Sequence, residues 1–182
     1  MNQEEICRIA VLGNACGGKT TLSRRLGEHC LVPVTHVDSI QFLPGMTIRP
    51  HAESIQALRA IQQQRRWLID GYGPLDILQE RLRLASLIVL IDLPLWRHYW
   101  WCTKRQFKNL WSRRVELPES CSERSWSQIK KIYKSLWQSH FKMRPELLRI
   151  LARDEFAPKV IYIRSIADWE RVAVLGPKIH PD

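Results

Sequence analysis

Residues Gly13-Asn14-Ala15-Cys16-Gly17-Gly18-Lys19-Thr20 decide the fold of this chain. They match G-x-x-x-x-G-K-[ST], the phosphate-binding loop motif (P-loop), at every fixed position. An apolar stretch typical of a buried strand, residues 7–13, comes before the loop, and a stretch with helical spacing, residues 18–29, comes after it. The glycines turn backbone N–H groups onto phosphate oxygens, and the helix N-terminus attracts negative charge. The motif therefore predicts a nucleoside triphosphate site.

The polar side chains at the end of the motif have separate expected roles. Lys19 would bridge the β- and γ-phosphates, the Thr20 hydroxyl would bind Mg²⁺, and Thr21 would reach the α-phosphate. The remaining nucleotide-binding positions form the loop itself: Gly13, Asn14, Ala15, Cys16, Gly17 and Gly18. A plain glycine-rich turn with an exposed lysine is the competing interpretation. Cys16 is read as a tolerated side chain rather than a redox switch.

Short apolar stretches alternate with stretches of helical spacing along the rest of the chain. Strands are predicted at residues 7–13, 31–38, 67–71, 86–93 and 159–164. Helices are predicted at residues 18–29, 51–66, 74–84 and 166–175, with two or three more within 95–154 and an irregular stretch through 44–50. Such alternation indicates an α/β fold with three layers, in which a parallel sheet has helices on both faces.

Length and composition fit a single compact domain. Of the 182 residues 45% are apolar and 25% charged, as in globular proteins rather than disordered or fibrous ones. No apolar stretch approaches the roughly 20 residues that cross a membrane, and the N-terminus is acidic where a secretory signal is basic. The five cysteines include no CxxC pair, so neither a zinc site nor a disulfide framework is indicated. We expect a cytoplasmic protein with reduced thiols.

Two carboxylates are predicted to follow strands of the sheet. In an open parallel sheet ligands bind beyond the carboxyl ends of the strands, where Asp38 and Asp70 would lie. Asp70 precedes Gly71, which permits a sharp turn, so its carboxylate could hold Mg²⁺ through water. Asp38 would face the acceptor and orient or deprotonate an attacking hydroxyl. The structural alternatives are a helix or loop cap for Asp38 and a turn-forming residue for Asp70, and Asp92 is read as structural.

Several segments, taken together in their order and spacing, resemble a known family. They are residues 13–21, Val37-Asp38-Ser-Ile-Gln-Phe-Leu-Pro-Gly45, Trp67-Leu-Ile-Asp70-Gly71, Ile91-Asp-Leu-Pro94, and Ser120-Cys-Ser-Glu-Arg124 followed by an aromatic-rich helix. The family is that of adenylate-kinase-like P-loop proteins labelled topology-modulation (FlaR-type) proteins. The resemblance implies a P-loop NTPase fold like that of nucleoside monophosphate kinases, with a five-stranded parallel sheet of order 2-3-1-4-5. It further implies ATP and Mg²⁺ as ligands and a helical lid over the phosphates.

One departure from that family concerns the acceptor. Adenylate kinases place an arginine just after the Asp-Gly of the third strand to grip the acceptor phosphate, whereas this chain has Tyr72-Gly73-Pro74. This weakens the case for a nucleoside monophosphate acceptor, although Arg49 in the preceding loop is a candidate replacement. The acceptor-binding candidates are therefore Asp38, Arg49 and Tyr72.

Positive charge is concentrated in one part of the chain. Residues 96–153 carry 14 of the 28 Lys and Arg, only 4 of the 18 Asp and Glu, and six of the eight tryptophans. Three interpretations stay open for this basic segment. It could be a lid, in which Arg105 and one of Arg113 and Arg114, taken as Arg114, neutralise the transferring phosphoryl group. It could instead bind nucleic acid, or be a solvated face with no ligand.

The start of this segment has the pattern of an amphipathic helix. Its aromatic stripe is expected to be a buried face, while Trp101 lies among the basic residues on the helical wheel. The stripe comprises Trp96, Tyr99, Trp100, Thr103, Phe107, Leu110 and Trp111. His98 and His140 are too irregularly spaced to suggest a metal site.

The sequence as a whole predicts an ATP-dependent phosphotransferase acting on a small-molecule or nucleotide acceptor. Lys19, Asp38, Arg105 and Arg114 are the expected catalytic residues, and Thr20 with Asp70 the expected metal site. The alternative is a nucleotide-gated nucleic-acid-binding protein that modulates DNA topology. An NTPase without a specific acceptor is a third possibility. The sequence does not identify the acceptor, the preference between ATP and GTP, or the oligomeric state.

Overall fold

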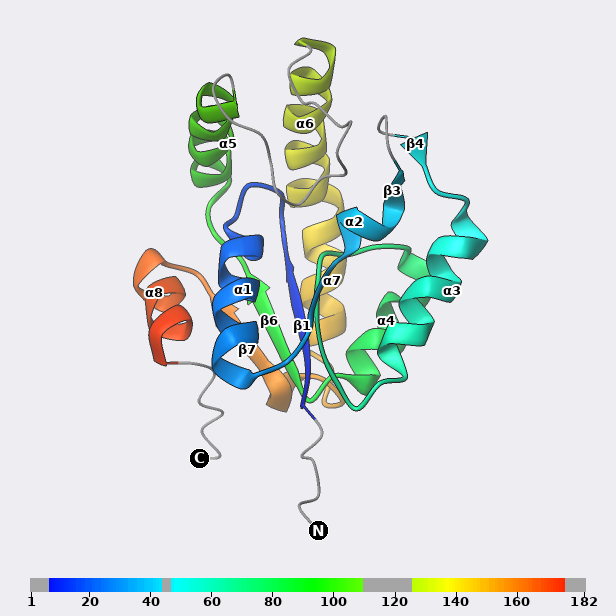
Figure 1. Ribbon diagram of the computed structural model, residues 1–182. Coiled ribbons are helices and arrows are strands. Elements are labelled where there is room, and N and C mark those ends of the chain that lie inside the picture. Colours follow the sequence, from blue (N-terminus) through cyan, green and yellow to red (C-terminus); the bar gives the residue numbers. More distant parts are fainter. Residues whose placement is uncertain (1–6, 44–46, 110–125, 176–182) are drawn as a thin grey trace.

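The computed structural model describes residues 7–43, 47–109 and 126–175, and its centre is a five-stranded parallel sheet (Figure 1). The strands are β1 (Cys7–Gly13), β2 (Val34–His36), β5 (Arg66–Asp70), β6 (Leu87–Ile91) and β7 (Val160–Ile163). Their order across the sheet is β2-β5-β1-β6-β7. Numbered along the chain among these five strands alone, the order is 2-3-1-4-5.

Helices cover both faces of the sheet and make the three layers that the alternating pattern predicts. On one face lie α1 (Lys19–Cys30) and α8 (Ile166–Leu175); on the other lie α3 (His51–Gln62), α4 (Leu75–Leu84) and α7 (Arg144–Leu151). Successive residues of β1 serve the two layers in turn. Ile9 and Val11 join the core with α1 and α8, while Ala10 and Leu12 join the core on the opposite face.

The segment between β2 and α3 is more ordered than the sequence indicates. The strand expected at 31–38 is only the three residues of β2, because the chain enters the short helix α2 (Val37–Gln41). Beyond α2, β3 (Phe42–Leu43) pairs in antiparallel fashion with β4 (Thr47–Ile48), which lies in the stretch expected to be irregular. Strand β2 is an edge strand that pairs with β5 alone, so few contacts extend it. Asp38 therefore lies in a helix rather than at a strand end.

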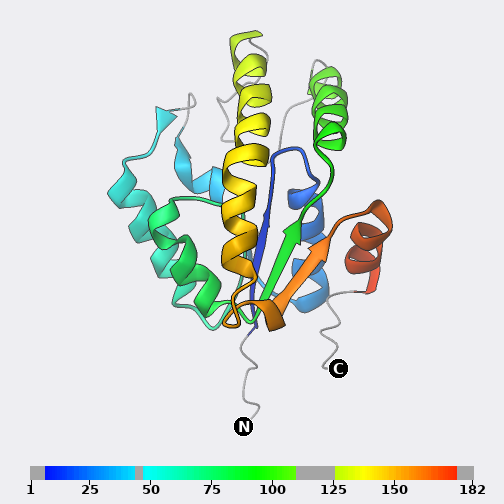
Figure 2. The same cartoon turned by 180° about the vertical axis from the view of Figure 1, so that it is seen from behind.

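Two helices stand beyond the carboxyl end of the sheet. They are α5 (Leu95–Asn109) and α6 (Trp126–Gln138), and α6 continues through a π-helical turn, η2 (Ser139–Met143), into α7 (Figure 2). The short helix η3 (Ala157–Lys159) then leads into β7. The Tyr99 and Tyr133 rings stack with centroids 5.5 Å apart, and the Thr103 and Tyr133 hydroxyls are 2.6 Å apart. These contacts hold α5 against α6.

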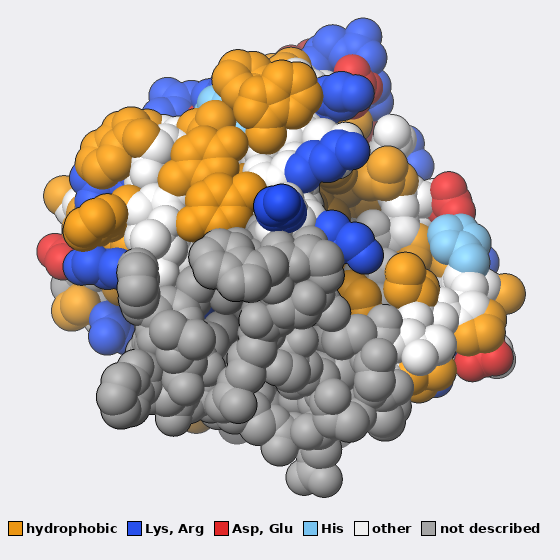
Figure 3. All heavy atoms as spheres, turned by 90° about the horizontal axis from the view of Figure 1, so that it is seen from above, with side chains coloured by type: hydrophobic (Ala, Val, Ile, Leu, Met, Phe, Trp, Pro, Cys, Tyr) orange, Lys and Arg blue, Asp and Glu red, His pale blue; other side chains and the backbone are white. Residues whose placement is uncertain are grey.

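The prediction that the aromatic stripe of α5 is buried is wrong for its two most N-terminal tryptophans. Trp96 is 59% exposed and Trp100 is 53% exposed, whereas His98 and Cys102 are buried and Trp101 packs against the core that contains α1. Apolar residues surround much of α5, so their spacing alone does not select the face that packs. Seen from above, hydrophobic side chains gather beside Lys and Arg on this end of the molecule (Figure 3).

Among the helices in the described ranges, none combines the length and apolar composition needed to span a bilayer.

Candidate functional site

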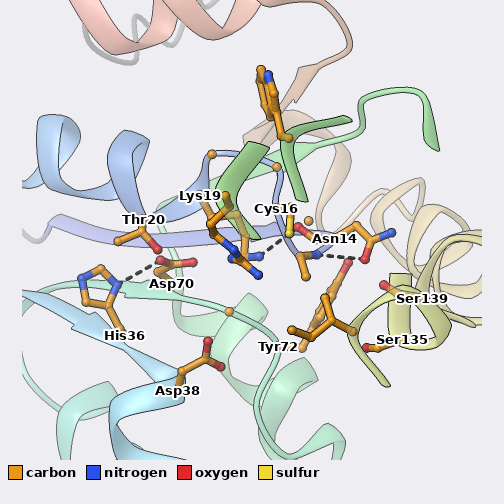
Figure 4. A pocket seen from close by; sticks show the side chains of 18 of the residues that line it. Asn14, Cys16, Lys19, Thr20, His36, Asp38, Asp70, Tyr72, Ser135 and Ser139 are labelled. Carbon is orange, nitrogen blue, oxygen red and sulfur yellow. Dashed lines mark hydrogen bonds and ion pairs between the residues drawn. The ribbon is translucent and has the colours of Figure 1, made fainter. Parts of the chain in front are cut away.

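A pocket of about 760 Å³ lies at the carboxyl end of the sheet, between the P-loop and the upright helices α5 and α6 (Figure 4). Most of the residues predicted for the site line this one pocket. They are Gly13, Asn14, Ala15, Cys16, Gly17, Gly18, Lys19, Thr20, Thr21, Asp38, Asp70, Tyr72 and Arg105. The pocket therefore brings together predicted site residues that are up to 92 positions apart in the sequence, from Gly13 to Arg105.

The P-loop backbone has the shape for which its glycines are needed. Gly18 has φ of +80° where it caps α1, and a Cβ there would lie 3.1 Å from Trp169 Nε1. Gly13 has φ of +143°, and a Cβ there would lie 2.7 Å from the Ile91 carbonyl oxygen. Lys19 Nζ donates to the Asn14 carbonyl oxygen at 3.0 Å, which holds the ammonium across the loop. The loop and the start of α1 together present positive charge to the pocket.

Two side chains tie the P-loop to the upright helices. Asn14 Nδ2 donates to the Leu136 carbonyl oxygen of α6 at 2.8 Å. His98 Nδ1 lies 2.9 Å from the Ala15 carbonyl oxygen and donates to it, because a carbonyl can only accept. Burial lowers the pKa of His98 below its usual value, so the ring is neutral at pH 7. No sequence spacing predicts this role of His98, because Ala15 lies 83 positions away.

The Asp70 carboxylate lies deep in the pocket beside Thr20 (Figure 4). Asp70 is only 5% exposed, and its Oδ2 lies 3.0 Å from His36 Nδ1. Its Oδ1 is buried without a hydrogen-bond partner. Gly71 follows with φ of +113°, the sharp turn expected from the Asp-Gly pair, and its N–H donates to the Val11 carbonyl oxygen at 3.0 Å. A buried carboxylate oxygen beside a hydroxyl is a donor set that suits Mg²⁺.

His36 also lines the pocket, although its position in the sequence does not predict it. It is the last residue of β2 and pairs with Asp70 at the end of the neighbouring strand β5. Parallel strands align their carboxyl ends, so the pairing of Asp70 with His36 across the sheet follows from the register. The contact between His36 and Asp70 can be predicted from the register of β2 against β5, but not from their separation of 34 residues in the sequence.

Asp38 and Tyr72 lie on the side of the pocket away from α5. Asp38 is exposed at the second position of α2 and points towards the space between Asp70 and Tyr72 (Figure 4). Tyr72 is half-buried, and its hydroxyl interacts with the backbone of Gly13 and the side chain of Ser139. Burial raises the pKa of Tyr72 to about 12, so the phenol is neutral.

The predicted arginines have three different outcomes. Arg105 lines the pocket from α5. Arg49 does not line it, because Nε donates to the Ile40 carbonyl oxygen at 2.8 Å and Nη1 lies 3.8 Å from Glu53. Arg114 lies outside the described residues, as does Arg113.

Asp92 lies behind the P-loop and does not line the pocket. Arg144 donates to both of its carboxylate oxygens, through Nε and, at 2.9 Å, through Nη2. This pairing raises the pKa of Arg144. Asp92 thus joins the end of β6 to α7, in agreement with the interpretation of Asp92 as a structural residue. Within the described ranges, no group of three His, Cys, Asp or Glu side chains is arranged to hold a metal ion.

Comparisons with known proteins give a fold but no family. No protein-family model matches the chain, and no curated protein matches its sequence. Shikimate kinase from Acinetobacter baumannii in complex with shikimate matches with a TM-score of 0.57 and 16% identity, over 93% of this chain and 90% of that one. This likeness shows that the two proteins share an α/β fold with a five-stranded parallel sheet.

Two further solved structures give weaker matches. A gluconokinase from Sinorhizobium meliloti 1021 matches with 15% identity over 94% of this chain and 91% of that one, with a TM-score of 0.47. Shikimate kinase from Bacteroides thetaiotaomicron matches with 13% identity over 92% and 94%, also with a TM-score of 0.47. The comparisons do not confirm the resemblance of the sequence to topology-modulation proteins.

Proposed function

We propose that this protein is an ATP-binding P-loop kinase that transfers the γ-phosphoryl group to a hydroxyl of a small-molecule acceptor. The observation that carries the proposal is the single pocket that joins the P-loop to two carboxylates, Asp38 and Asp70. A glycine-rich turn with a purely structural role would not need either carboxylate beside it. A kinase needs all three parts, since phosphoryl transfer depends on phosphate binding, charge neutralisation and an oriented nucleophile.

The nucleotide half of the proposed site is the loop of residues 13–21. Its amides and the start of α1 hold the phosphate oxygens, and Thr21 reaches the α-phosphate. Lys19 exchanges its 3.0 Å hydrogen bond to the Asn14 carbonyl for the β- and γ-phosphates. Arg105, on the pocket wall, and Arg114 neutralise the charge that spreads over the transferring group.

Thr20 and Asp70 are the residues that would hold Mg²⁺. The fit rests on the buried Asp70 Oδ1, which has no hydrogen-bond partner and would be costly to leave so. Bound there, the metal would neutralise phosphate charge and orient the γ-phosphoryl group. His36 fixes the other oxygen, so the carboxylate presents Oδ1 in one orientation.

Asp38 is the proposed base. Its exposed carboxylate can accept the hydroxyl proton as the acceptor oxygen attacks, and Tyr72 forms part of the wall beside it. Arg49 has no place in this site, because its guanidinium is engaged with Ile40 and Glu53.

The nucleic-acid alternative gains no support from the described residues. The exposed indoles of α5 each have a cation of the same helix over one ring face: Arg97 lies 4.5 Å from the Trp96 ring centroid and Lys104 lies 5.0 Å from that of Trp100. A stacking base would have to displace these cations from that face.

Two variants test the proposal. Lys19→Ala should lose MgATP binding in titration calorimetry, whereas Lys134→Ala, an exposed lysine of α6, should bind as the native protein does. Asp38→Asn should keep the ATP affinity and lose about 10²-fold or more in transfer rate, measured as ADP release with an acceptor panel. Native ATP turnover in Lys19→Ala would refute the proposed site.

A further inference from the structure

The pocket has two walls that differ in charge. Three Lys and Arg side chains of the described chain line it, and they come from the P-loop (Lys19), α5 (Arg105) and α6 (Lys131). The opposite side, here called the acceptor wall, consists of the lining residues within 36–42 and 70–73. The acceptor wall contributes two carboxylates and, among its described residues, neither Lys nor Arg. Positive charge therefore gathers where the phosphates of ATP would lie.

Asp38 gives the acceptor wall a carboxylate that no described residue pairs with. Its carboxylate makes no hydrogen bond or ion pair with any described residue, and it points into the pocket (Figure 4). Asp70 is different, since His36 binds one of its oxygens and the other is the buried Oδ1 that the proposed metal would contact. With nucleotide and metal bound, Asp38 remains the exposed charge of this wall.

Arg49 and Arg81, two arginines of the described ranges near the acceptor wall, are both turned away from the pocket. Arg49 is engaged with the Ile40 carbonyl oxygen and Glu53. Arg81 is fully buried behind the loop of residues 71–73, and its Nη1 donates to the Gly71 carbonyl oxygen at 2.7 Å. Neither lines the pocket, so neither is placed to pair with an anionic group on the acceptor.

The remainder of the acceptor wall suits the body of an uncharged molecule. Phe42 and Tyr72 are half-buried aromatic side chains that line it, and Gln41 adds an amide. Ser135 and Ser139 face this wall from α6 and its continuation (Figure 4). Apolar and aromatic lining with a few placed hydrogen-bonding groups is typical of small-molecule sites, and neutral amides and hydroxyls can pair with the hydroxyls of a ligand.

We propose that the acceptor is an uncharged hydroxyl compound, such as a sugar, polyol or nucleoside, and carries neither phosphate nor carboxylate. This inference rests on the kinase function proposed above. The acceptor oxygen forms a bond to the γ-phosphorus, the bond from that phosphorus to the β-γ bridging oxygen breaks to release ADP, and the hydroxyl proton passes to Asp38. An anionic acceptor would bring a second negative charge beside Asp38, and the described residues of the acceptor wall include no Lys or Arg to offset it.

The test compares neutral acceptors with their anionic counterparts. A panel of such pairs includes adenosine with AMP, glucose with gluconate, and methyl shikimate with shikimate. ADP release at saturating MgATP gives kcat/KM for each compound. In the pair with the highest kcat/KM, we expect the value for the neutral compound to exceed that for its anionic counterpart by about tenfold or more. Preference for the anionic member would overturn the inference.

The Asp38→Asn variant tests the cause of this preference. Loss of the base lowers the transfer rate for both members of a pair. The ratio of their kcat/KM values is therefore unaffected by that loss and reports the effect of the charge at position 38 alone. The ratio should fall towards one in Asp38→Asn and stay native in Asp76→Asn, which removes an exposed carboxylate of α4 outside the pocket. An unchanged ratio in Asp38→Asn would contradict the role given to this charge.

The outcomes separate this inference from the proposed function. Transfer to AMP, gluconate or shikimate in preference to their neutral partners would support the kinase and refute the uncharged acceptor. MgATP binding without transfer to any compound of the panel would refute the kinase, and the inference would fail with it.

Discussion

Arg81 provides the sharpest prediction about stability, because it is a fully buried guanidinium with a single hydrogen bond. Its Nη1 donates to the Gly71 carbonyl oxygen at 2.7 Å, while Nε and Nη2 are buried without partners. Burial lowers the pKa of Arg81 to about 10, well below the usual value of an arginine. At about 1.4 kcal/mol per pKa unit, keeping the charge buried costs about 3 kcal/mol at neutral pH.

Replacing Arg81 by Met should therefore change stability little. The variant removes the burial cost, and it also loses a charge-assisted hydrogen bond that contributes about 1.5–3 kcal/mol. The two effects offset one another, and we expect the free energy of unfolding to change by less than about 1.5 kcal/mol. The loop of residues 71–73, which lines the pocket, loses its anchor, so acceptor KM should rise by about tenfold.

Urea denaturation and steady-state kinetics measure these two effects separately. Arg83→Met is the matched control, since Arg83 lies on the same helix but is exposed and pairs with Glu155. The control should leave both stability and acceptor KM near native. The buried charge also predicts a pH dependence. Because the pKa of Arg81 is lower in the folded protein than in the unfolded chain, the free-energy cost of burying the charge diminishes as pH rises through about 10. Above that pH the free energy of unfolding of the native protein should rise relative to that of Arg81→Met. A loss of 4 kcal/mol or more in Arg81→Met, with native KM, would refute this account.

Three further predictions concern the site and its supports. Asp70→Asn should weaken ATP binding in Mg²⁺ by about tenfold and leave binding in EDTA within about twofold, as calorimetry can show; equal losses in both would exclude the metal role. Because burial lowers the pKa of His98, the unfolded chain binds the proton more readily, so the free energy of unfolding should fall as pH drops through about 6.5 towards 5. Urea denaturation should show a smaller fall in His98→Gln, and an identical fall would assign it to other groups. Arg144→Met should cost about 1–2 kcal/mol in urea, a figure reduced for the 38% exposure of the arginine side chain, and a cost near zero would mean that Asp92 is solvated.

The predictable part of the site is the part that a local rule governs. Glycines at fixed spacing define the P-loop, and the rule that ligands lie beyond parallel strands locates Asp70. Asp38 was placed in the same pocket for partly the wrong reason, since it belongs to α2 and not to the end of β2. The short helix still starts at the sheet's carboxyl end, so the error in secondary structure does not move the residue out of the pocket.

The missed or wrong features depend on contacts that only the folded chain makes. His36 and His98 act through partners 34 and 83 residues away. Arg81 is charged, yet α4 buries it, and no sequence pattern marks an arginine without a counter-ion. On α5 the apolar side chains leave more than one face able to pack, and contacts with α6 and the core select the one that includes Trp101 and leaves Trp100 exposed.

The contacts that hold the P-loop also bear on how the upright helices could act during the proposed reaction. His98 of α5 bonds the Ala15 carbonyl and Asn14 bonds a carbonyl of α6, so neither helix can move far without disturbing the loop. Arg105 is two turns beyond His98 on the same helix and lines the same pocket. Any movement that brings Arg105 onto a transferring phosphoryl group must therefore keep residues near His98 fixed and bend or rotate the part of α5 beyond it. The His98 contact would then be the pivot, and its loss should affect phosphate binding before it affects the acceptor.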